Sequence, residues 1–478
     1  MTSLLLPEEK RREAWKNLGE KLEDYIKSVD DLNVPQNATA ESIHSILKTV
    51  DFAKEIDVNE AIEWTNSLLK KHLLHIASAD YYGVFNPQAS SMSLIADAFL
   101  AVYNPQLASS ASAMLCIEME NHLLRFFANK FGLNETTTKG SFTSGATEAN
   151  FMALLCALAE KIDNYRSNGL KKLDKWPVVY CSQESHGSIK RSCRISGLGT
   201  DALQVIDVVD NLQMNLEQLE QQINEDIKEG RLPLMVVANL GSTSSGTIDN
   251  LDGIAKIAKK YNIWFHVDAA WGGAALLLEE YSYLRESMEN ADSVSFDPHK
   301  WLSIAIGCGM FLVKRGHLLR QTFSIESTAY MPDETQINEQ SEPYRDTLQW
   351  SRRFTGLKLF LTLLVHGEKG YSDVLQHQID IGKYLKEQLQ KNSWQVLNST
   401  PWPVACFVDT KHNCDVKELL NLVNSKGDTW ITNTELMWKK RPVLRVGISN
   451  FRTDKENIDK LITALENART SLVANKNA

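Results

Sequence analysis

The middle of the chain, from about Lys139, alternates short apolar runs with stretches of helical spacing. Between the runs, NLEQLEQQINEDIKEG and NLDGIAKIAKKYN carry apolar residues every three to four positions, which predicts helices. The apolar runs that predict strands are WPVVYCS, ALQVIDVV, LPLMVVANLG, IWFHVDAA, ADSVSFD and GCGMFLVKR. This alternation predicts an α/β fold in which helices cover both faces of a mainly parallel sheet. Ligands of such folds bind at the carboxyl ends of the strands.

The two ends of the chain have a different pattern. An amphipathic helix is expected near the N-terminus, and its apolar face must pack on something, another subunit for example. The residues of that face are Trp15, Leu18, Leu22, Tyr25 and Val29. After about Tyr371, helices mix with the strand-like runs PVACFVD and PVLRVGIS, which is typical of an α+β module. We therefore expect an N-terminal helical segment that packs in a dimer (1–75), a large ligand-binding domain (76–370) and a small C-terminal α+β domain (371–478).

Composition and charge narrow the classes of function. The 478 residues carry a net charge of −9, so neither nucleic acid nor an anionic membrane is expected as the main partner. No apolar run reaches the roughly 18 residues of a membrane span, and the N-terminal MTSLLLPEEK is too short in its apolar part for a signal peptide. The seven cysteines form no C-x-x-C pair, which is typical of reduced thiols inside a cell. We expect a cytoplasmic protein without a metal site.

A turn of small residues opens one predicted helix. In GSFTSGATEAN, residues 143–147 precede a helical pattern that starts near Glu148. The backbone N–H groups and the dipole of a helix N-terminus favour an anion such as phosphate, and the hydroxyl groups add donors. Simple capping of the helix by serine or threonine is the alternative.

Two further motifs place polar residues at strand ends. In WFHVDAAWGGA, strand alternation sends His266 and Asp268 to the same face, with Asp268 near the carboxyl end. Asp268 could pair with a ligand cation, cap the next helix or share a metal with His266, although further metal ligands at suitable spacing are missing. His186, in SQESHGS, follows another strand and could equally be a structural histidine.

Lys300 stands inside an otherwise apolar stretch, SVSFDPHKWLSIAIGCGMFLV. Burial of a lysine costs several kcal/mol unless its charge is paired or removed, so Lys300 either points to solvent or takes part in chemistry. A phosphate turn, a histidine, a strand-end aspartate and such a lysine together match pyridoxal 5′-phosphate. The aldehyde of this cofactor forms a Schiff base with a lysine, its ring nitrogen pairs with a carboxylate, and its phosphate suits a helix N-terminus.

The motifs SFDPHKW, HVDAAWGG, TSGATEAN and SQESHGS resemble those of the pyridoxal-phosphate-dependent group II amino-acid decarboxylases. This family includes the aromatic-L-amino-acid, glutamate, cysteine sulfinate, histidine and tyrosine decarboxylases. The resemblance implies fold type I, like aspartate aminotransferase, with a mainly parallel seven-stranded sheet in the large domain. It also implies a homodimer with active sites at the interface, and decarboxylation of an L-amino acid to the amine and CO₂.

The resemblance implies roles around the cofactor ring. Lys300 matches the Schiff-base lysine, and Asp268 matches the carboxylate that keeps the ring nitrogen protonated. His186 matches the residue stacked on one face of the ring, Ala270 matches the small contact on the other face, and Thr243 matches a threonine near the ring.

Three residues match the phosphate site of the family. These are Ala146 and Thr147 at the start of the helix, with His299 close by. Asp297, in the same motif as His299, departs from the asparagine that is frequent in relatives of the aromatic enzyme. Trp301 is expected to be a packing residue.

Tyr330 lies in the polar stretch SIESTAYMPDETQINEQSEPYRD, where the family carries a mobile catalytic loop with a tyrosine. The resemblance implies that Tyr330 is the general acid that returns a proton to Cα. Relatives with phenylalanine there tend to form an aldehyde, so Tyr330 favours plain decarboxylation. A tyrosine that only anchors the loop is the alternative.

The substrate is left open by the sequence. Phe85, with the tyrosines of ADYYGVFNPQASS, and Ser351, at a position that varies among plant aromatic decarboxylases, favour an aromatic L-amino acid. Arg445 matches an arginine that binds the substrate carboxylate in glutamate enzymes and favours an acidic substrate. Glutamate, aspartate and 2,4-diaminobutyrate stay possible, as do an aldehyde synthase or a lyase. Ala79 and Asp80 stand where the family often has a His-Pro pair, and Asp80 either faces solvent or alters the pocket.

Overall fold

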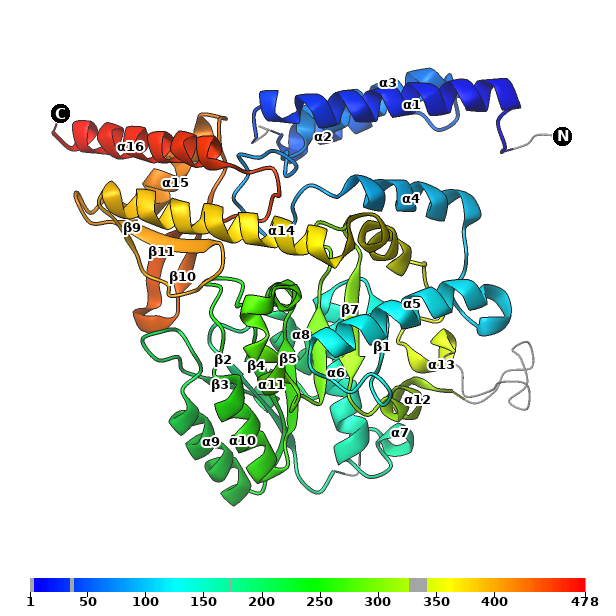
Figure 1. Ribbon diagram of the computed structural model, residues 1–478, viewed down its shortest axis with the longest axis vertical. Coiled ribbons are helices and arrows are strands. Elements are labelled where there is room, and N and C mark those ends of the chain that lie inside the picture. Colours follow the sequence, from blue (N-terminus) through cyan, green and yellow to red (C-terminus); the bar gives the residue numbers. More distant parts are fainter. Residues whose placement is uncertain (1–3, 35–37, 172, 326–341, 478) are drawn as a thin grey trace.

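The protein is described here by a computed structural model that covers residues 4–34, 38–171, 173–325 and 342–477 (Figure 1). Tyr330 falls outside the described residues, so its predicted role stays a prediction.

A seven-stranded sheet forms the centre of the large domain, in the order β1-β7-β6-β5-β4-β2-β3. Neighbouring strands from β3 to β6 in this order are parallel, and only β7 runs antiparallel to its two neighbours. The mainly parallel seven-stranded sheet expected from the sequence is therefore confirmed. The strands are β1 (Lys139–Thr143), β2 (Pro177–Ser182), β3 (Leu203–Ile206), β4 (Leu232–Asn239), β5 (Trp264–Asp268), β6 (Ser293–Phe296) and β7 (Gly309–Val313).

Helices cover both faces of this sheet, because successive strand residues point to opposite sides. In β2, for example, Tyr180 enters the core on one face and Cys181 enters the core on the other. The helices on the Cys181 face are α6 (Ala146–Lys161), α8 (Ser188–Ile195) and α12 (His317–Phe323). Those on the Tyr180 face are α5 (Ser110–Lys130), α9 (Leu216–Lys228), α10 (Leu251–Tyr261) and α11 (Tyr283–Met288).

The C-terminal part forms a four-stranded antiparallel sheet with helices packed on it, as an α+β module requires (Figure 1). A long helix, α14 (Gly356–Lys391), leads into it and is broken at Gly367, whose φ of 67° is left-handed. This helix runs through the boundary expected at residue 370, which stays a prediction. The other elements are β8 (Trp394–Val396), β9 (Val404–Asp409), α15 (Val416–Ser425), β10 (Thr432–Leu436), β11 (Arg441–Gly447) and α16 (Lys455–Asn477).

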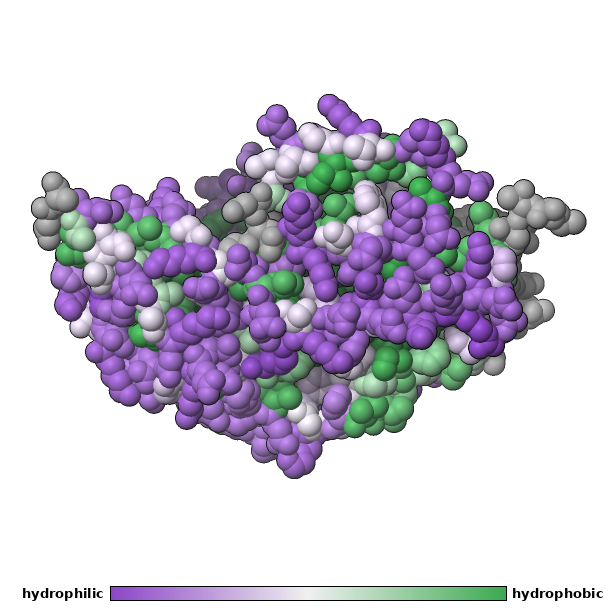
Figure 2. Space-filling model, turned by 90° about the horizontal axis from the view of Figure 1, so that it is seen from above, coloured by the Kyte–Doolittle hydropathy of each residue, from purple (hydrophilic) through white to green (hydrophobic). Residues whose placement is uncertain are grey.

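The N-terminal helices lie along one side of the molecule. They are α1 (Glu8–Ser28), α2 (Ala40–Leu47), α3 (Val58–His72) and α4 (Ser91–Tyr103). Helix α1 packs along α3, and Lys21 pairs with Glu63 between them. Yet α1 has no buried residue, and Trp15 of its predicted apolar face is 51% exposed. Figure 2, which looks onto this side, shows hydrophobic side chains exposed between hydrophilic ones.

The remaining helical turns are short. They are η1 (Val29–Asp31), α7 (Tyr165–Asn168), η2 (Thr200–Ala202), η3 (Gly272–Leu277), η4 (Glu279–Tyr281), α13 (Pro343–Asp346) and η6 (Trp438–Lys440). None of the helices in the described ranges is long and apolar enough to cross a membrane.

Candidate active site

A cavity of about 320 Å³ opens at the carboxyl ends of the central strands. Asn239 ends β4, Asp268 ends β5, and Asp297 directly follows β6. The cavity is therefore at the edge of the sheet where the fold predicts a ligand. Its walls are Ser144, Gly145, Ala146, Thr147, His186, Asn239, Gly241, Ser242, Thr243, Asp268, Ala270, Trp271, Asp297, His299, Lys300 and Ile306. All eight residues predicted to bind the cofactor are among them.

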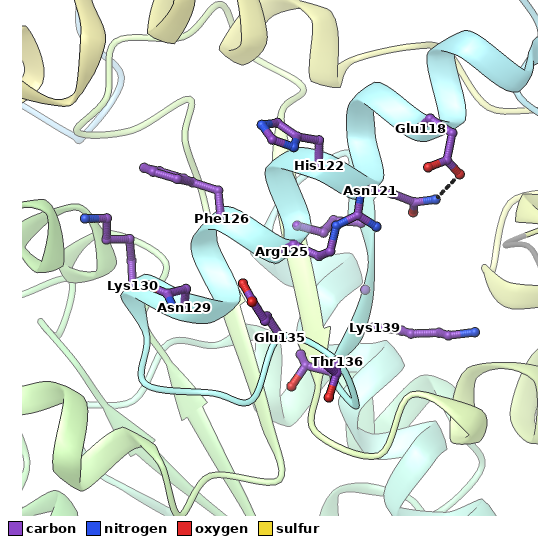
Figure 3. Close-up of a pocket in the computed structure, with 13 residues that line it drawn as sticks. Glu118, Asn121, His122, Arg125, Phe126, Asn129, Lys130, Glu135, Thr136 and Lys139 are labelled. Atoms are coloured by element: carbon purple, nitrogen blue, oxygen red, sulfur yellow. Dashed lines mark hydrogen bonds between the residues drawn. The ribbon is translucent and has the colours of Figure 1, made fainter.

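A wider hollow of about 730 Å³ lies along α5 and the segment that leads to β1 (Figure 3). Its labelled side chains include Glu118, His122, Arg125 and Lys139, which are exposed and of mixed charge. None of the predicted site residues lines this hollow. The smaller cavity at the strand ends is therefore the candidate active site.

The predicted phosphate turn links β1 to α6 and forms one wall of the cavity. Ala146 and Thr147 are the first two residues of α6. The first backbone N–H groups of a helix have no partner within the helix, so these two residues can present N–H groups to an anion. Ser144 donates from its backbone N and its Oγ to Glu148 Oε2, both at 2.8 Å, which fixes the turn.

Asp268 is held by three hydrogen bonds at the end of β5. Asn150, on α6, donates to Asp268 Oδ2 at 2.9 Å, and Ala270 N donates to Oδ1 at 3.1 Å. Ser295 Oγ donates to Oδ1 at 3.4 Å. The carboxylate is 7% exposed and faces the cavity, so it is placed to accept a hydrogen bond from a ligand cation.

His266 and Asp268 are joined through the side chain of Asn150. His266 Nε2 lies 2.9 Å from Asn150 Oδ1, and His266 Nδ1 lies 2.8 Å from Ser293 Oγ. Trp264 Nε1 donates to the same Ser293 Oγ at 2.9 Å. Among the described residues, no group of three or more His, Cys, Asp or Glu side chains could hold a metal ion.

The hydrogen bonds run in series from Asp268 through Asn150, His266 and Ser293 to Trp264. The direction of each bond follows from the groups at the two ends of this series. The Asp268 carboxylate only accepts, so Asn150 must turn its NH₂ group to Asp268 and its oxygen to His266. His266 Nε2 therefore carries the proton, and its Nδ1 accepts from the Ser293 hydroxyl, which in turn accepts from the Trp264 indole. Burial lowers the pKa of His266 to about 4, which agrees with this neutral form.

The second hydrogen of the Asn150 amide extends this hydrogen-bond series to His186. Asn150 Nδ2 donates to Ser188 Oγ at 2.9 Å, and Ser188 Oγ lies 2.9 Å from His186 Nδ1. Ser188 N donates to the same Nδ1 at 3.2 Å, so this nitrogen is an acceptor. Burial lowers the pKa of His186, and the neutral ring therefore carries its proton on Nε2. Asn150 is a site residue that the sequence patterns do not point to, although it lies inside the TSGATEAN motif.

Lys300 lies in the loop between β6 and β7, not in a strand. Its Nζ is 3.1 Å from Asp297 Oδ2, and its side chain is 24% exposed at the cavity. His299 Nδ1 lies 2.8 Å from the carbonyl oxygen of Cys308, and burial lowers the pKa of His299. Trp301 stacks on Trp271 at 4.5 Å and donates to Gln378, so it is a packing residue as expected.

Two predicted substrate residues lie behind the cavity wall. Phe85 stacks on Trp271 at 4.3 Å, and the guanidinium of Arg445 lies 4.6 Å from the centre of the Phe85 ring. Arg445 Nε donates to the carbonyl oxygen of Thr243, and its Nη1 donates to that of Gly83. Arg445 thus joins the Thr243 loop to the segment that carries Phe85.

Ser351, the third predicted substrate residue, lies away from this cavity. It is exposed and accepts a hydrogen bond from Gln106 Nε2 at 2.6 Å. Within one subunit, the structure does not bring Ser351 together with the other site residues.

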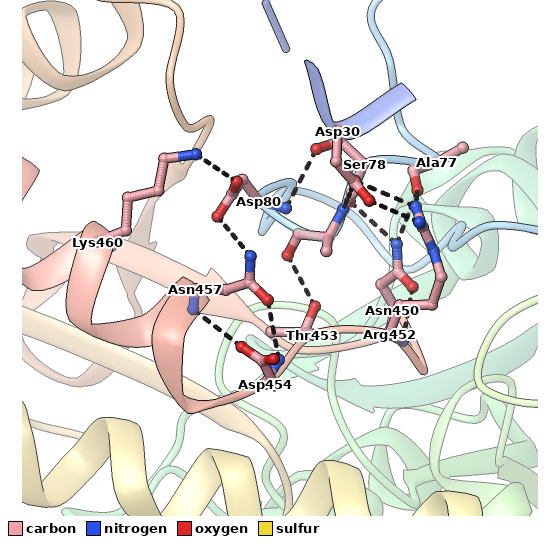
Figure 4. Close-up of polar contacts among 11 residues, drawn as sticks. Asp30, Ala77, Ser78, Asp80, Asn450, Arg452, Thr453, Asp454, Asn457 and Lys460 are labelled. Carbon is pink, nitrogen blue, oxygen red and sulfur yellow. Dashed lines mark hydrogen bonds and ion pairs between the residues drawn. The ribbon is translucent and has the colours of Figure 1, made fainter. Parts of the chain in front are cut away.

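Asp80 neither faces solvent nor lines the cavity (Figure 4). Its carboxylate is buried and accepts from Asn457 Nδ2 at 3.0 Å and Lys460 Nζ at 2.7 Å, both on α16. Nearby, Arg452 bonds Asp30 and the carbonyl oxygen of Ala77. The segment that leads to Phe85 is therefore tied to the C-terminal module, and Asp80 is a structural residue.

The cavity fits pyridoxal phosphate by its donors and by its free space. A buried carboxylate, an amine, a helix N-terminus and the imidazole of His186 surround it. The glycine at position 145 leaves space between the turn before α6 and His299, because a Cβ at this position would lie only 3.3 Å from His299 Cε1. When bound, this cofactor draws electrons from a bond at the substrate Cα.

Sheet order and cavity together define a pyridoxal-phosphate enzyme of fold type I. The chain belongs to the pyridoxal-dependent decarboxylase family, because the profile described as "Pyridoxal-dependent decarboxylase conserved domain" matches residues 44–408. It is therefore a carboxy-lyase that acts on an amino acid with pyridoxal phosphate as cofactor.

Known proteins resemble the chain along most of its length. An aromatic-L-amino-acid decarboxylase of Bacillus atrophaeus is 24% identical over 95% of both chains. An acidic amino acid decarboxylase of Xenopus tropicalis is 28% identical over 73% of this chain and 69% of its own. The crystal structure of Oryza sativa TDC with PLP and tryptamine superposes with a TM-score of 0.92, at 20% identity, over 98% of this chain and all of the other. This last likeness shows the fold.

Proposed function

We propose that this enzyme decarboxylates an aromatic L-amino acid to the corresponding amine and CO₂. The observation that carries the proposal is the position of Asp268, at the end of β5, and Lys300, in the loop after the neighbouring strand β6, because both face one cavity. A ring-nitrogen partner and a Schiff-base lysine have to be on the same side of a sheet to hold one cofactor.

The proposal assigns a role in cofactor binding to each predicted residue of the cavity wall. Lys300 would attach the cofactor, and Asp268, oriented by Asn150, would accept a hydrogen bond from the ring nitrogen. His186 and Ala270 would contact the ring. Ala146, Thr147 and His299 would bind the phosphate, and Thr243 would lie near the ring.

Reaction specificity depends on which bond of Cα stands perpendicular to the cofactor ring. The residues of the cavity wall would select loss of CO₂ by holding the substrate carboxylate in that direction. A proton then returns to Cα, and we assign this step to Tyr330. Tyr330 favours the amine over the aldehyde that an aldehyde synthase would release.

An aromatic substrate is favoured by the resemblance to the Bacillus atrophaeus enzyme. One observation favours an acidic substrate instead. Arg445 is buried, and its Nη2 has no hydrogen-bond partner among the described residues. Burial lowers the pKa of Arg445, and a substrate carboxylate could offset the cost of this charge. The acidic-substrate decarboxylase is therefore the second candidate.

The substrate is tested by incubating the reconstituted enzyme with each of the twenty common amino acids, DOPA, 2,4-diaminobutyrate and cysteine sulfinate. The released CO₂ and the amine are both measured. We expect the largest kcat/KM for tyrosine, DOPA or tryptophan. A preference for glutamate or aspartate would replace the first candidate by the second, and an aldehyde product would contradict both.

We also propose that the enzyme is a homodimer with its active sites at the interface. Ile306 lines the cavity and is 73% exposed, so the cavity wall is incomplete in one subunit. Exposed apolar side chains continue along α4, at Leu94, Ile95, Phe99, Val102 and Tyr103. Sedimentation should give twice the chain mass, and a monomer with full activity would contradict the proposal.

A further inference from the structure

Asp297 is a second carboxylate in the cofactor cavity, and none of the roles above uses it. It directly follows β6, where its backbone N donates to the carbonyl oxygen of Ala270 at 3.0 Å. Its side chain is 3% exposed, and it lines the cavity. A buried carboxylate at this depth needs a compensating charge.

Lys300 supplies that charge. Asp297 Oδ2 lies 3.1 Å from Lys300 Nζ, and Asp297 Oδ1 is buried without a hydrogen-bond partner in the described part of the chain. Gly309 makes room for this oxygen, because a Cβ there would lie only 2.8 Å from it. The ion pair with Lys300 is therefore the main contact of the Asp297 side chain.

None of the other charged or titratable groups described around Asp297 supplies the compensating positive charge in place of Lys300. His299 Nε2 is 3.8 Å from Asp297 Oδ2, but burial lowers the pKa of His299 and keeps it neutral. His186 is neutral for the same reason. Asp268, at the end of β5, is another negative charge. Lys358, on α14, directs its Nζ to the carbonyl oxygens of Ala305 and Ile306.

We propose that Asp297 is the counter-ion of the Lys300 nitrogen, both in the free amine and in the Schiff-base linkage to the cofactor. It is a positioning residue that acts through Lys300, and this role rests on the proposed role of Lys300. A carboxylate beside the linkage favours its protonated form, which is the form that an incoming substrate amine attacks. The aspartate in SFDPHKW thus extends the pH range in which the resting enzyme is reactive.

The test is a pH titration of the visible absorption band of the reconstituted enzyme, which reports protonation of the linkage without turnover. Asp297→Asn and Asp297→Ser each remove the charge. We expect the midpoint of the band to fall by about one pH unit or more in both variants. We also expect the loss of kcat/KM to grow with pH.

The matched control is Asp292→Asn. Asp292 precedes the other end of β6, pairs with Arg315 and is away from the cavity, so its removal should leave the midpoint unchanged. A folded Asp297 variant with the wild-type midpoint would overturn the proposal. If neither variant folds, the carboxylate is a requirement of folding and the proposal is likewise overturned.

Borohydride reduction of the wild type distinguishes a failure of the proposed role of Asp297 from a failure of the proposed role of Lys300. Cofactor fixed to Lys300 together with an unmoved midpoint would overturn the role of Asp297 alone. Cofactor fixed to another residue would overturn the role of Lys300, and that of Asp297 with it.

Discussion

Asn150 donates from one side-chain amide to both Asp268 Oδ2 and Ser188 Oγ, at 2.9 Å each. Since Ser188 bonds His186, this amide joins the carboxylate at the end of β5 to the imidazole after β2. The two residues that should contact the cofactor ring are thus held by one side chain of α6.

Asn150→Ala should therefore weaken cofactor binding. A hydrogen bond to a charged group contributes about 1.5–3 kcal/mol, so we expect the dissociation constant of pyridoxal phosphate to rise about tenfold to a hundredfold. Fluorescence titration of the apoprotein measures this constant. Asn211→Ala, at an exposed site, is the control and should bind like the wild type. Equal affinity of both variants would show that Asn150 does not support the site.

Stability should fall in mild acid. The pKa of His266 is about 4 in the folded chain, against about 6.5 when unfolded, because burial disfavours its charge. The unfolded chain thus binds more protons below pH 6.5, and stability decreases as the pH falls from 6.5 towards 4. The full effect is on the order of 3 kcal/mol.

Urea unfolding at several pH values measures this loss. His266→Gln should lose less stability on acidification than the wild type, while His412→Gln, at the surface, should lose as much. The same acid sensitivity in His266→Gln and the wild type would contradict the assignment.

Asp80→Asn should destabilise the protein without emptying the cofactor site. Asp80 is buried, whereas its partner Lys460 is about half exposed, so solvent reduces the effect of the lost charge. We expect a loss of about 1–3 kcal/mol in the free energy of unfolding. Asp373→Asn, in the exposed pair with Lys369, should change it by less than about 1 kcal/mol. A larger loss of cofactor affinity than of stability would place Asp80 at the site instead.

Tyr330→Phe should keep the cofactor and lose the amine product. Removal of a general acid lowers the rate about a hundredfold or more. Product analysis should show a larger share of aldehyde. Tyr283→Phe, at an exposed position of α11, is the control and should produce amine at the wild-type rate. Undiminished amine from Tyr330→Phe would refute the assigned role.

Much of the fold follows from the sequence because strand and helix periodicity is a local property. The runs around Asp268 and Lys300 predict the sheet and its ligand-binding edge, and the resemblance predicts the cofactor walls. Asn150 could not be found this way, since only the packing of α6 on β5 brings its amide to Asp268. The burial of Asp80 depends on Asn457 and Lys460, which lie more than 370 positions away in the sequence. Local sequence patterns cannot predict contacts of this kind.

The most direct test of the account is to find where the cofactor is attached. The enzyme is reconstituted with pyridoxal phosphate, reduced with borohydride, digested and analysed by mass spectrometry, with Lys300→Ala as the control. We predict that the reduced cofactor is found on Lys300 and is absent from the variant. Cofactor on another lysine, or the same labelling of Lys300→Ala, would contradict the central claim.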